Sequence, residues 1–354
     1  MCQEAMINFE IQEKMKQNGV PGLGIAVLQH GQMAWQGSYG VVEAGTQLTV
    51  TEESLFPACS ISKMVTAIGV LCLVQEGVLS LEEDVNRYLV SWNVPENQFT
   101  KQKKVTLRNL LAHQAGFVDL RGSFDTYQEQ DPFPSPKELL MGTTKYHSEL
   151  AQVTYLPESR FSYSDAGYTV VEQILEDVSG ESFAAALERL VMKPLGLKRT
   201  LFWDGITNEP AGAIMGHDKW GHVVEGKRAH YPNLSGAGLW TTPKELSVLS
   251  SEVMKAWNGD PNGILRPAMA KMMLTGYASD KGVGLGVFLP HAGEQLGFVS
   301  QGWGVGSQSK LVGYPRQESC IAVMMNAEPG KPQNESLIGE VIREMCKHYE
   351  LPML

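Results

Sequence analysis

A serine and a lysine three residues apart, Ser60 and Lys63, form the sharpest chemical signal in the sequence. On a helix, positions i and i+3 lie on one face, so the lysine can bring its ammonium group to the serine hydroxyl. A serine hydroxyl is a weak nucleophile until a base takes its proton, and a desolvated lysine with a lowered pKa can do this. If Ser60 lies in the first helical turn, its own N–H is free to stabilise an oxyanion. The pair predicts nucleophilic catalysis; the alternative is the polar start of a buried helix.

The same S-x-x-K pattern occurs a second time, at Ser307 and Lys310. That copy lies in a predicted strand, where positions i and i+3 point to opposite faces, so it predicts no catalytic pair. The residues that follow Lys63, from Met64 to Val74, are apolar on nearly all sides. Such a segment is typical of a buried central helix.

Tyr163, Ser164 and Asp165 stand at a turn just before a strongly periodic helical segment. A tyrosine beside a cleft can act as a general base if a nearby ammonium group lowers its pKa from about 10. The alternative is that Ser164 or Asp165 caps the helix while Tyr163 packs. The two interpretations are compatible with each other.

A third segment, Gly302 to Gly306, precedes a predicted strand near the end of the chain. Glycines at such a place let the backbone approach a ligand closely or form a bulge. The alternative is a hairpin turn that buries the indole of Trp303.

Strands are predicted near both ends of the chain, with helices between them. A helix over 4–18 precedes strands over 22–30 and 33–40; strands over 284–289, 309–314 and 320–326 precede a last helix over 336–350. This order predicts an α+β fold, with an antiparallel sheet flanked by the N- and C-terminal helices and a mostly helical insertion. We expect one domain from 1–58 and 272–354, a helical domain from 59–271, and the active site in the cleft between them.

The composition describes an acidic globular protein. The 354 residues contain 29 Lys and Arg against 39 Asp and Glu, a net charge of −10, which argues against nucleic acid and anionic membranes as partners. No apolar stretch reaches the roughly 20 residues of a membrane span. The spacing of cysteines and histidines indicates neither a disulfide framework nor a metal site. No leader is visible at the start, so we expect a cytoplasmic protein.

Taken together, the three motifs resemble the serine β-lactamase and penicillin-binding-protein superfamily, for which S-x-x-K is a signature. The order is S-x-x-K at a helix start, Y-S-D about 100 residues later and a glycine-rich segment near the C-terminus. The likeness is greatest to the class C β-lactamase branch, which includes the family VIII carboxylesterases. It runs from about residue 20 to about 326 and includes the segments LRNLLAHQAGF, PLGLKRT and GAGLWTTPKEL. It implies a β-lactamase/transpeptidase-like fold that needs no cofactor.

Position by position, the resemblance makes Ser60 the acyl-accepting nucleophile and Lys63 its hydrogen-bonded activator. Tyr163 would be the general base and then the acid that protonates the leaving group. Asp165 stands where the β-lactamases usually have asparagine, which alters the contacts to an acyl side-chain amide. His113 resembles a structural position near the cleft, and we expect no catalytic role for it.

At the third motif, β-lactamases and transpeptidases have Lys-Thr/Ser-Gly, whereas Gly302-Trp303-Gly304 resembles the Trp-Gly-Gly of family VIII esterases. The N–H groups of Ser60 and of Gly306 would form the oxyanion hole. On this alignment the site lacks the cation that binds the carboxylate of penicillins, and a buried carboxylate without that partner costs several kcal/mol. The resemblance therefore implies a carboxylesterase for small, short-chain acyl esters, with weak or incidental β-lactam hydrolysis.

Other activities share this chemistry and stay open. They are those of a β-lactamase, a DD-peptidase or D-aminopeptidase of the penicillin-binding-protein type, and an acyltransferase. An alternative of another class is an acyl or β-lactam sensor, which would be acylated on Ser60 without turnover. We expect the partner to be a small ester, amide or β-lactam, and the protein to be a monomer or small homo-oligomer.

Overall fold

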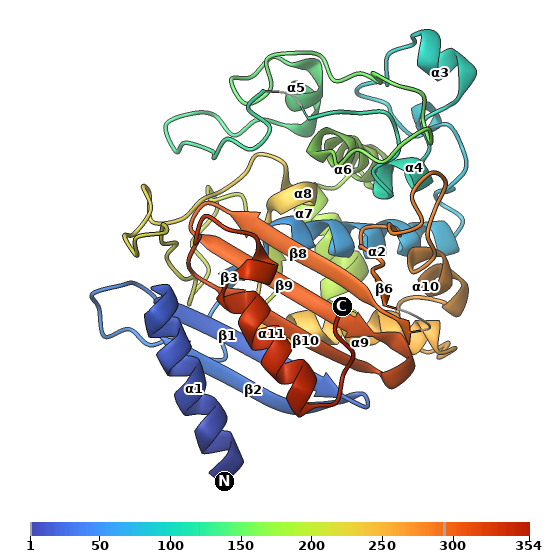
Figure 1. Ribbon diagram of the computed structural model, residues 1–354. Coiled ribbons are helices and arrows are strands. Elements are labelled where there is room, and N and C mark those ends of the chain that lie inside the picture. The colour runs from blue at the N-terminus through green and yellow to red at the C-terminus, as the bar shows by residue number, and fades with distance from the viewer. Residues whose placement is uncertain (1, 120, 293–294) are drawn as a thin grey trace.

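The computed structural model describes residues 2–119, 121–292 and 295–354 and is built around a five-stranded antiparallel sheet (Figure 1). The strand order is β2-β1-β10-β9-β8, so strands from the two ends of the chain pair in the middle of the sheet. The five strands are β1 (Gly22–Gln29), β2 (Gln32–Gly40), β8 (Phe298–Gly304), β9 (Ser307–Tyr314) and β10 (Ser319–Met325). The α+β fold predicted from the sequence is confirmed.

Alternate residues of a strand point to opposite faces of the sheet, and in the central strands each face packs against a different hydrophobic core. Both faces of these strands are therefore buried. In β1, Leu23 and Ile25 pack with α1 (Cys2–Asn18) and α11 (Leu337–His348), whereas Leu28 packs into the core that contains α9 (Pro243–Trp257). Residues Leu23 and Met325 are opposite each other where β1 pairs with β10. In Figure 1, α1 and α11 lie in front of the sheet and α9 lies behind it.

The segment between β2 and β8 contains the remaining helices, which irregular loops connect. Its longest helices are α2, α6 and α9, and every residue of α2 from Ser62 to Leu73 is buried, as expected of a central helix. Apart from α9, the helices here are α2 (Ser62–Gln75), α3 (Gln98–Gln102), α4 (Leu107–Leu111), α5 (Pro136–Met141), α6 (Asp165–Ser179), α7 (Phe183–Leu187), α8 (Leu234–Ala237) and α10 (Pro267–Met273), with the 3-10 turns η1 (Cys59–Ile61) and η2 (Val85–Arg87) and the π-helical turn η3 (Glu188–Met192).

Two small sheets complete the fold. One is formed by β3 (Phe56–Pro57), β5 (Leu239–Thr241) and β4 (Leu201–Phe202), the other by β6 (His291–Ala292) and β7 (Gln295–Leu296). Although α9 belongs to the central segment of the chain, it contacts β1, β9 and β10 of the main sheet. The domain boundaries at residues 58 and 271 stay a prediction. Within the described ranges, no helix is long and apolar enough to cross a membrane.

The strand predicted over 284–289 is wrong. Gly286 has a φ of +75°, in the left-handed region, and this interrupts extended backbone after Leu285. A side chain at Gly286 would place its Cβ 2.7 Å from the carbonyl oxygen of Lys63. The segment is therefore a loop that crosses directly over the start of α2, and its apolar residues line a cavity beside Ser60 instead of extending the sheet.

Candidate active site

Ser60 lies in η1, which leads directly into α2, so its hydroxyl stands at the N-terminal end of the buried central helix. The preceding residue, Cys59, has a φ of +47°, a left-handed conformation that is uncommon for a residue with a side chain. Strand β8 packs closely on this turn: a Cβ added to Gly302 would lie 2.1 Å from the carbonyl oxygen of Ala58. The absence of a side chain at Gly302 thus lets the sheet edge approach the backbone beside Ser60.

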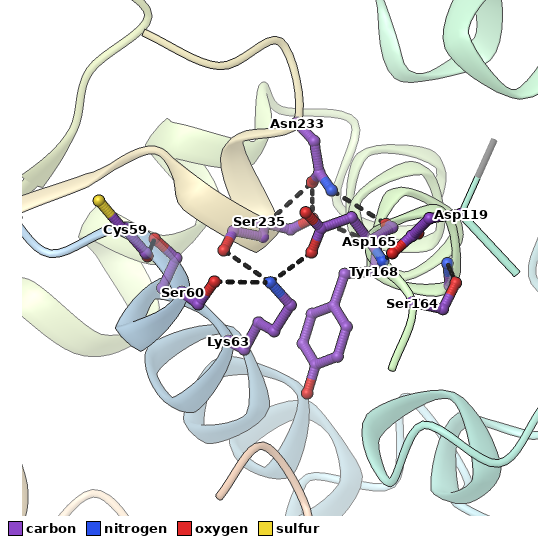
Figure 2. A network of polar contacts seen from close by, with 12 residues as sticks. Cys59, Ser60, Lys63, Asp119, Ser164, Asp165, Tyr168, Asn233 and Ser235 are labelled. Carbon is purple, nitrogen blue, oxygen red and sulfur yellow. Dashed lines mark hydrogen bonds and ion pairs between the residues drawn. The ribbon is translucent and has the colours of Figure 1, made fainter. Parts of the chain in front are cut away.

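Lys63 occupies the centre of the polar network in Figure 2. Its Nζ donates hydrogen bonds to Ser60 Oγ at 3.4 Å and to the Gly236 carbonyl at 2.9 Å, and it forms an ion pair with Asp165. The Lys63 side chain is only 3% exposed. The predicted contact between the lysine and the serine is therefore present, with two further acceptors that hold the ammonium group.

The expectation of a lowered pKa for Lys63 is wrong. Burial disfavours the charged amine, but the adjacent Asp165 carboxylate and, to a smaller extent, Tyr163 outweigh burial and raise the pKa of Lys63 above its usual value. The ammonium form is therefore the resting form. In this state Lys63 is a hydrogen-bond donor and a positive charge beside Ser60, not a free base.

Tyr163 lies over this cation, with the Lys63 Nζ 4.8 Å from the centre of its ring. The ring also stacks on His113, at 4.3 Å between centroids and 24° between planes. Burial raises the pKa of Tyr163 above its usual value, although the Lys63 charge and hydrogen bonding to Lys63 and Ser60 act in the opposite direction. The lowered tyrosine pKa considered from the sequence is thus not found, and Tyr163 rests as a neutral phenol.

His113 is an acceptor for the backbone that carries Tyr163. Its Nδ1 accepts a hydrogen bond from the Ser164 N–H at 3.1 Å. Burial, followed by the charge of Lys63, lowers the pKa of His113 well below its usual range, so the ring is neutral. Ser164 itself caps α6, because its hydroxyl accepts the Gly167 N–H at 3.0 Å. Capping and placement of Tyr163 therefore occur together.

A second carboxylate, Asp119, stands behind Asp165 at the start of α6. Its Oδ1 accepts hydrogen bonds from the backbone N–H groups of Asp165 at 2.6 Å and Ala166 at 3.1 Å. Burial raises the pKa of Asp119 to about 6, and the neighbouring Asp165 charge raises it as well. Asp119 fixes the helix start that holds Asp165, and no sequence motif had singled it out.

The short helix α8 lies between α2 and α6 and is hydrogen-bonded to both of them. Its Gly236 carbonyl accepts from Lys63, and the Asn233 side chain at its N-terminus donates to the backbone carbonyl of Asp165 at 2.9 Å. The sequence analysis included this segment in the family resemblance but predicted no contact with Lys63 or Asp165, because its contacts to α2 and α6 are largely made by backbone atoms. A further signal was the N-capping asparagine before Leu-Ser-Gly.

A cavity of about 20 Å³ lies beside Ser60, Lys63 and Tyr163. Strand β8 contributes Ser300 and Gln301 to its wall, so Lys63 is the one cation among the described lining residues. The remaining wall comes from His113 and from the loop residues Val283, Gly286, Val287 and Phe288.

The predicted third-motif residues are not among those that line this cavity. Trp303 is 44% exposed, and its indole N–H donates to Glu328 at 2.9 Å. Gly304 packs on Cys59, where an added Cβ would lie 2.8 Å from the sulfur. The Gly306 carbonyl accepts the His217 N–H at 3.1 Å. Of the predicted residues, the structure brings Ser60, Lys63, Tyr163 and Asp165 together.

The site offers no evident ligand set for a metal ion. In the part of the chain that the structure describes, no group of three or more His, Cys, Asp or Glu side chains is arranged to hold one. The Cys59 thiol beside Ser60 is buried, and burial raises its pKa to about 11, so it is not a thiolate ligand or nucleophile near neutral pH.

Comparisons with known proteins show similarity over most of the chain. In Staphylococcus aureus strain MRSA252, Protein flp is 22% identical over 257 residues, which is 72% of this chain and 48% of that protein; the chain thus spans about half the length of this relative. The octameric penicillin-binding protein homologue from Pyrococcus abyssi matches with a TM-score of 0.79, 21% identity, and coverage of 98% of this chain and 77% of that one. EstCE1, described as a hydrolase with promiscuous acyltransferase activity, matches with a TM-score of 0.71, 19% identity, and coverage of 96% and 98%. The family model described as Beta-lactamase matches residues 8–341, nearly the whole chain, and the protein therefore belongs to the Beta-lactamase family.

Proposed function

We propose that the protein is a serine hydrolase that forms an acyl-enzyme on Ser60 and acts as a carboxylesterase on small, short-chain acyl esters. The observation that carries the proposal is the position of Lys63, whose ammonium group contacts Ser60 Oγ, Asp165 and the face of the Tyr163 ring at once. A charge held in this way stabilises negative charge on the serine oxygen as it attacks.

Because Tyr163 rests as a neutral phenol, it works as a proton relay. As Ser60 Oγ bonds to the acyl carbon, its proton passes to the Tyr163 oxygen, and the phenol proton passes to the departing alcohol oxygen as the acyl–oxygen bond breaks. Water then attacks the acyl-enzyme, and the same relay returns a proton to Ser60 Oγ while the acid leaves. Lys63 stays an ammonium ion throughout.

Two backbone N–H groups are suitable for the oxyanion. One belongs to Ser60. The N–H and C=O of Val299 hydrogen-bond to Phe288, so they point away from β9. Backbone groups two residues apart in a strand point to the same side, so the N–H of Trp303, four residues later, also points away from β9. The Trp303 N–H at the free edge of β8 is therefore a better second donor than the expected N–H of Gly306, which lies in the turn after the strand.

The preference for esters rests on the wall of the cavity. Ser300 and Gln301 of β8 supply neutral groups there, so a substrate carboxylate would find no second cation among the described lining residues. The fold likeness to EstCE1, whose description names a hydrolase with acyltransferase activity, supports acyl chemistry of this kind. The cytoplasmic location and the small-molecule substrate stay predictions.

The test is a panel of p-nitrophenyl esters compared with a chromogenic cephalosporin. We expect a burst of nitrophenol followed by steady turnover, with a higher kcat/KM for short-chain esters than for the cephalosporin, and an acyl adduct on Ser60 in the mass spectrum. Ser60→Ala should abolish both burst and adduct. Ser148→Ala, at an exposed serine outside the wall of the cavity, is the control and should keep turnover. A permanent adduct without turnover would instead indicate a sensor, and faster cephalosporin hydrolysis would indicate a β-lactamase.

A further inference from the structure

The four-residue helix α8 is held between the two helices that carry the reacting groups. On the α2 side, the Ser235 carbonyl accepts the Thr66 hydroxyl at 2.9 Å, and the Gly236 carbonyl accepts Lys63. On the α6 side, the Ser235 hydroxyl donates to the Tyr168 carbonyl at 2.9 Å. Figure 2 shows Ser235 and Asn233 beside Lys63 and Asp165. The position of α8 thus sets how Lys63 lies relative to α6.

The side chain that completes this connection is Glu172, in the middle of α6. It is 2% exposed, and its Oε2 accepts the backbone N–H of Ser235 at 2.8 Å. Within the described residues, no lysine, arginine or histidine forms an ion pair with Glu172. Burying a charged carboxylate without a cation costs free energy. Glu172 takes no part in the proposed reaction, so a structural role is needed to explain why it is buried.

We propose that Glu172 is a positioning residue for the active site: in its neutral acid form it fixes α8 against α6 and thereby holds the Gly236 carbonyl where it receives Lys63. The inference rests on the proposed function, because the atom that α8 positions is the ammonium group beside Ser60. Glu172 itself does not touch the substrate or Ser60.

The surroundings of Glu172 favour the neutral form near pH 7. Burial raises the pKa of Glu172 to about 8, and hydrogen bonds from Ser235 and from the Leu234 N–H lower it only in part. The neighbouring charge that acts on it is Glu176, one turn further along α6, which also raises the pKa. Helices α7 and α8, which pack on α6, contain no titratable residue.

The other elements packed on α6 direct their charges elsewhere. In α4, Arg108 pairs with Glu82. In α5, Lys137 is exposed, and Glu138 bonds to Ser135 at the start of its own helix. Ionisation of Glu172 above about pH 8 would therefore place a buried charge without a cation under α8, and hydration of that charge requires α8 to move away from α6 and admit water.

The experiment compares Glu172→Gln with the wild type from pH 6 to 10. Glutamine keeps the size and the acceptor oxygen but cannot ionise. At pH 6.5 we expect kcat/KM within about threefold of the wild type; above pH 8 the wild-type value should fall as Glu172 ionises, and the variant should lack that fall. Glu176→Gln is the matched control. Its carboxylate bonds to the Phe183 N–H on the α7 side, so this variant should keep the alkaline fall that Glu172→Gln lacks, at a somewhat lower pH because the Glu176 charge no longer raises the pKa of Glu172.

Glu172→Leu should lower kcat about 10- to 100-fold at pH 6.5, because small displacements of reacting groups have effects of this size. Hydrogen exchange gives a readout that needs no turnover: the amides of residues 235–237 should lose protection in Glu172→Leu and keep it in Glu172→Gln. Superimposable pH profiles for the wild type and Glu172→Gln would overturn the inference, as would full protection of these amides in Glu172→Leu. A protein that hydrolyses no ester at any pH, with the exchange pattern as expected, would overturn the proposed function and leave the positioning role supported.

Discussion

The Asp165 carboxylate and the Lys63 ammonium group form an ion pair in which the two side chains are 7% and 3% exposed. Both charged groups are buried away from water, so each is stabilised by the other and by the surrounding hydrogen bonds. The pair fixes the protonation state of the lysine beside Ser60 and places a negative charge near Tyr163. The acidic residue at position 165 thus controls the titration of both neighbouring groups.

Replacing Asp165 with asparagine should move the alkaline titration of the site to lower pH. The carboxylate raises the pKa of Lys63 and also that of Tyr163, so removal of its charge lowers both. In the Glu172→Gln background, which lacks the fall above pH 8, we expect the remaining alkaline feature of the kcat/KM profile to move to lower pH. Profiles of the two proteins from pH 6 to 10.5 measure this. Asp177→Asn, on the same helix but bonded to Ser91, should leave the profile in place, and an equal shift in both variants would contradict the explanation.

Tyr163→Phe should reduce kcat by about 10²- to 10⁴-fold with little change in KM, because the variant keeps the ring but loses the relay oxygen. The stack on His113 is preserved, so the unfolding temperature should change little. Tyr168→Phe is the comparison that isolates the hydroxyl. Its ring also faces Lys63, at 5.4 Å, but its OH donates to the Leu111 carbonyl. A similar loss of kcat in both variants would count against a relay through Tyr163.

Gln301→Lys should improve the use of substrates that carry a carboxylate. It adds a cation to the neutral β8 wall of the cavity, and a charge-assisted hydrogen bond contributes about 1.5–3 kcal/mol, or roughly 10- to 100-fold. The measurement is the ratio of kcat/KM for a penicillin to that for a neutral nitrophenyl ester. Gln301→Met has a similar length without charge and should leave the ratio unchanged. If the two variants alter the ratio equally, charge at this wall does not select the substrate.

Asp119→Asn should change how stability depends on pH. The pKa of Asp119 in the folded protein is raised to about 6, so folding favours its protonated form. The contribution of this group to the free energy of unfolding is therefore largest below about pH 4 and is lost as the pH rises through 6. Asparagine keeps an acceptor for the Asp165 and Ala166 amides but cannot ionise. Between pH 4 and pH 7, the free energy of unfolding of the variant should rise relative to that of the wild type by up to about 3 kcal/mol. Denaturant unfolding at both pH values tests this, with the exposed Asp125→Asn as the control. An equal difference at both pH values would refute it.

Much of the fold follows from patterns that are visible along the chain. The apolar runs of β1 and β10 predicted buried strands, and the run after Lys63 predicted a buried helix, because these elements are covered on all sides. The segment over 284–289 has the same composition, yet it is a loop. There the close approach of Gly286 to the Lys63 carbonyl decides the conformation, and that contact spans more than 200 residues of sequence.

Sequence analysis predicted only those site residues that belong to short sequence motifs. Ser60, Lys63 and Tyr163 belong to short patterns, and the structure brings them together with Asp165. Asp119 and Glu172 act through backbone N–H groups, which every residue possesses, so no pattern of residue types marks them. The direction of the Lys63 pKa was missed for a related reason. Burial alone lowers it, and the opposing charge of Asp165 enters only through the fold.

The pairing of β1 with β10 also determines when the molecule can become active during synthesis. Leu23 is made early, and its partner Met325 emerges about 300 residues later. Strand β8, whose edge packs beside Ser60, joins the sheet only through β9 and β10. A nascent chain therefore has the serine, the lysine and the tyrosine long before it has the wall that completes their site. We expect hydrolase activity to appear only with the last strand, so that an unfinished polypeptide cannot hydrolyse esters.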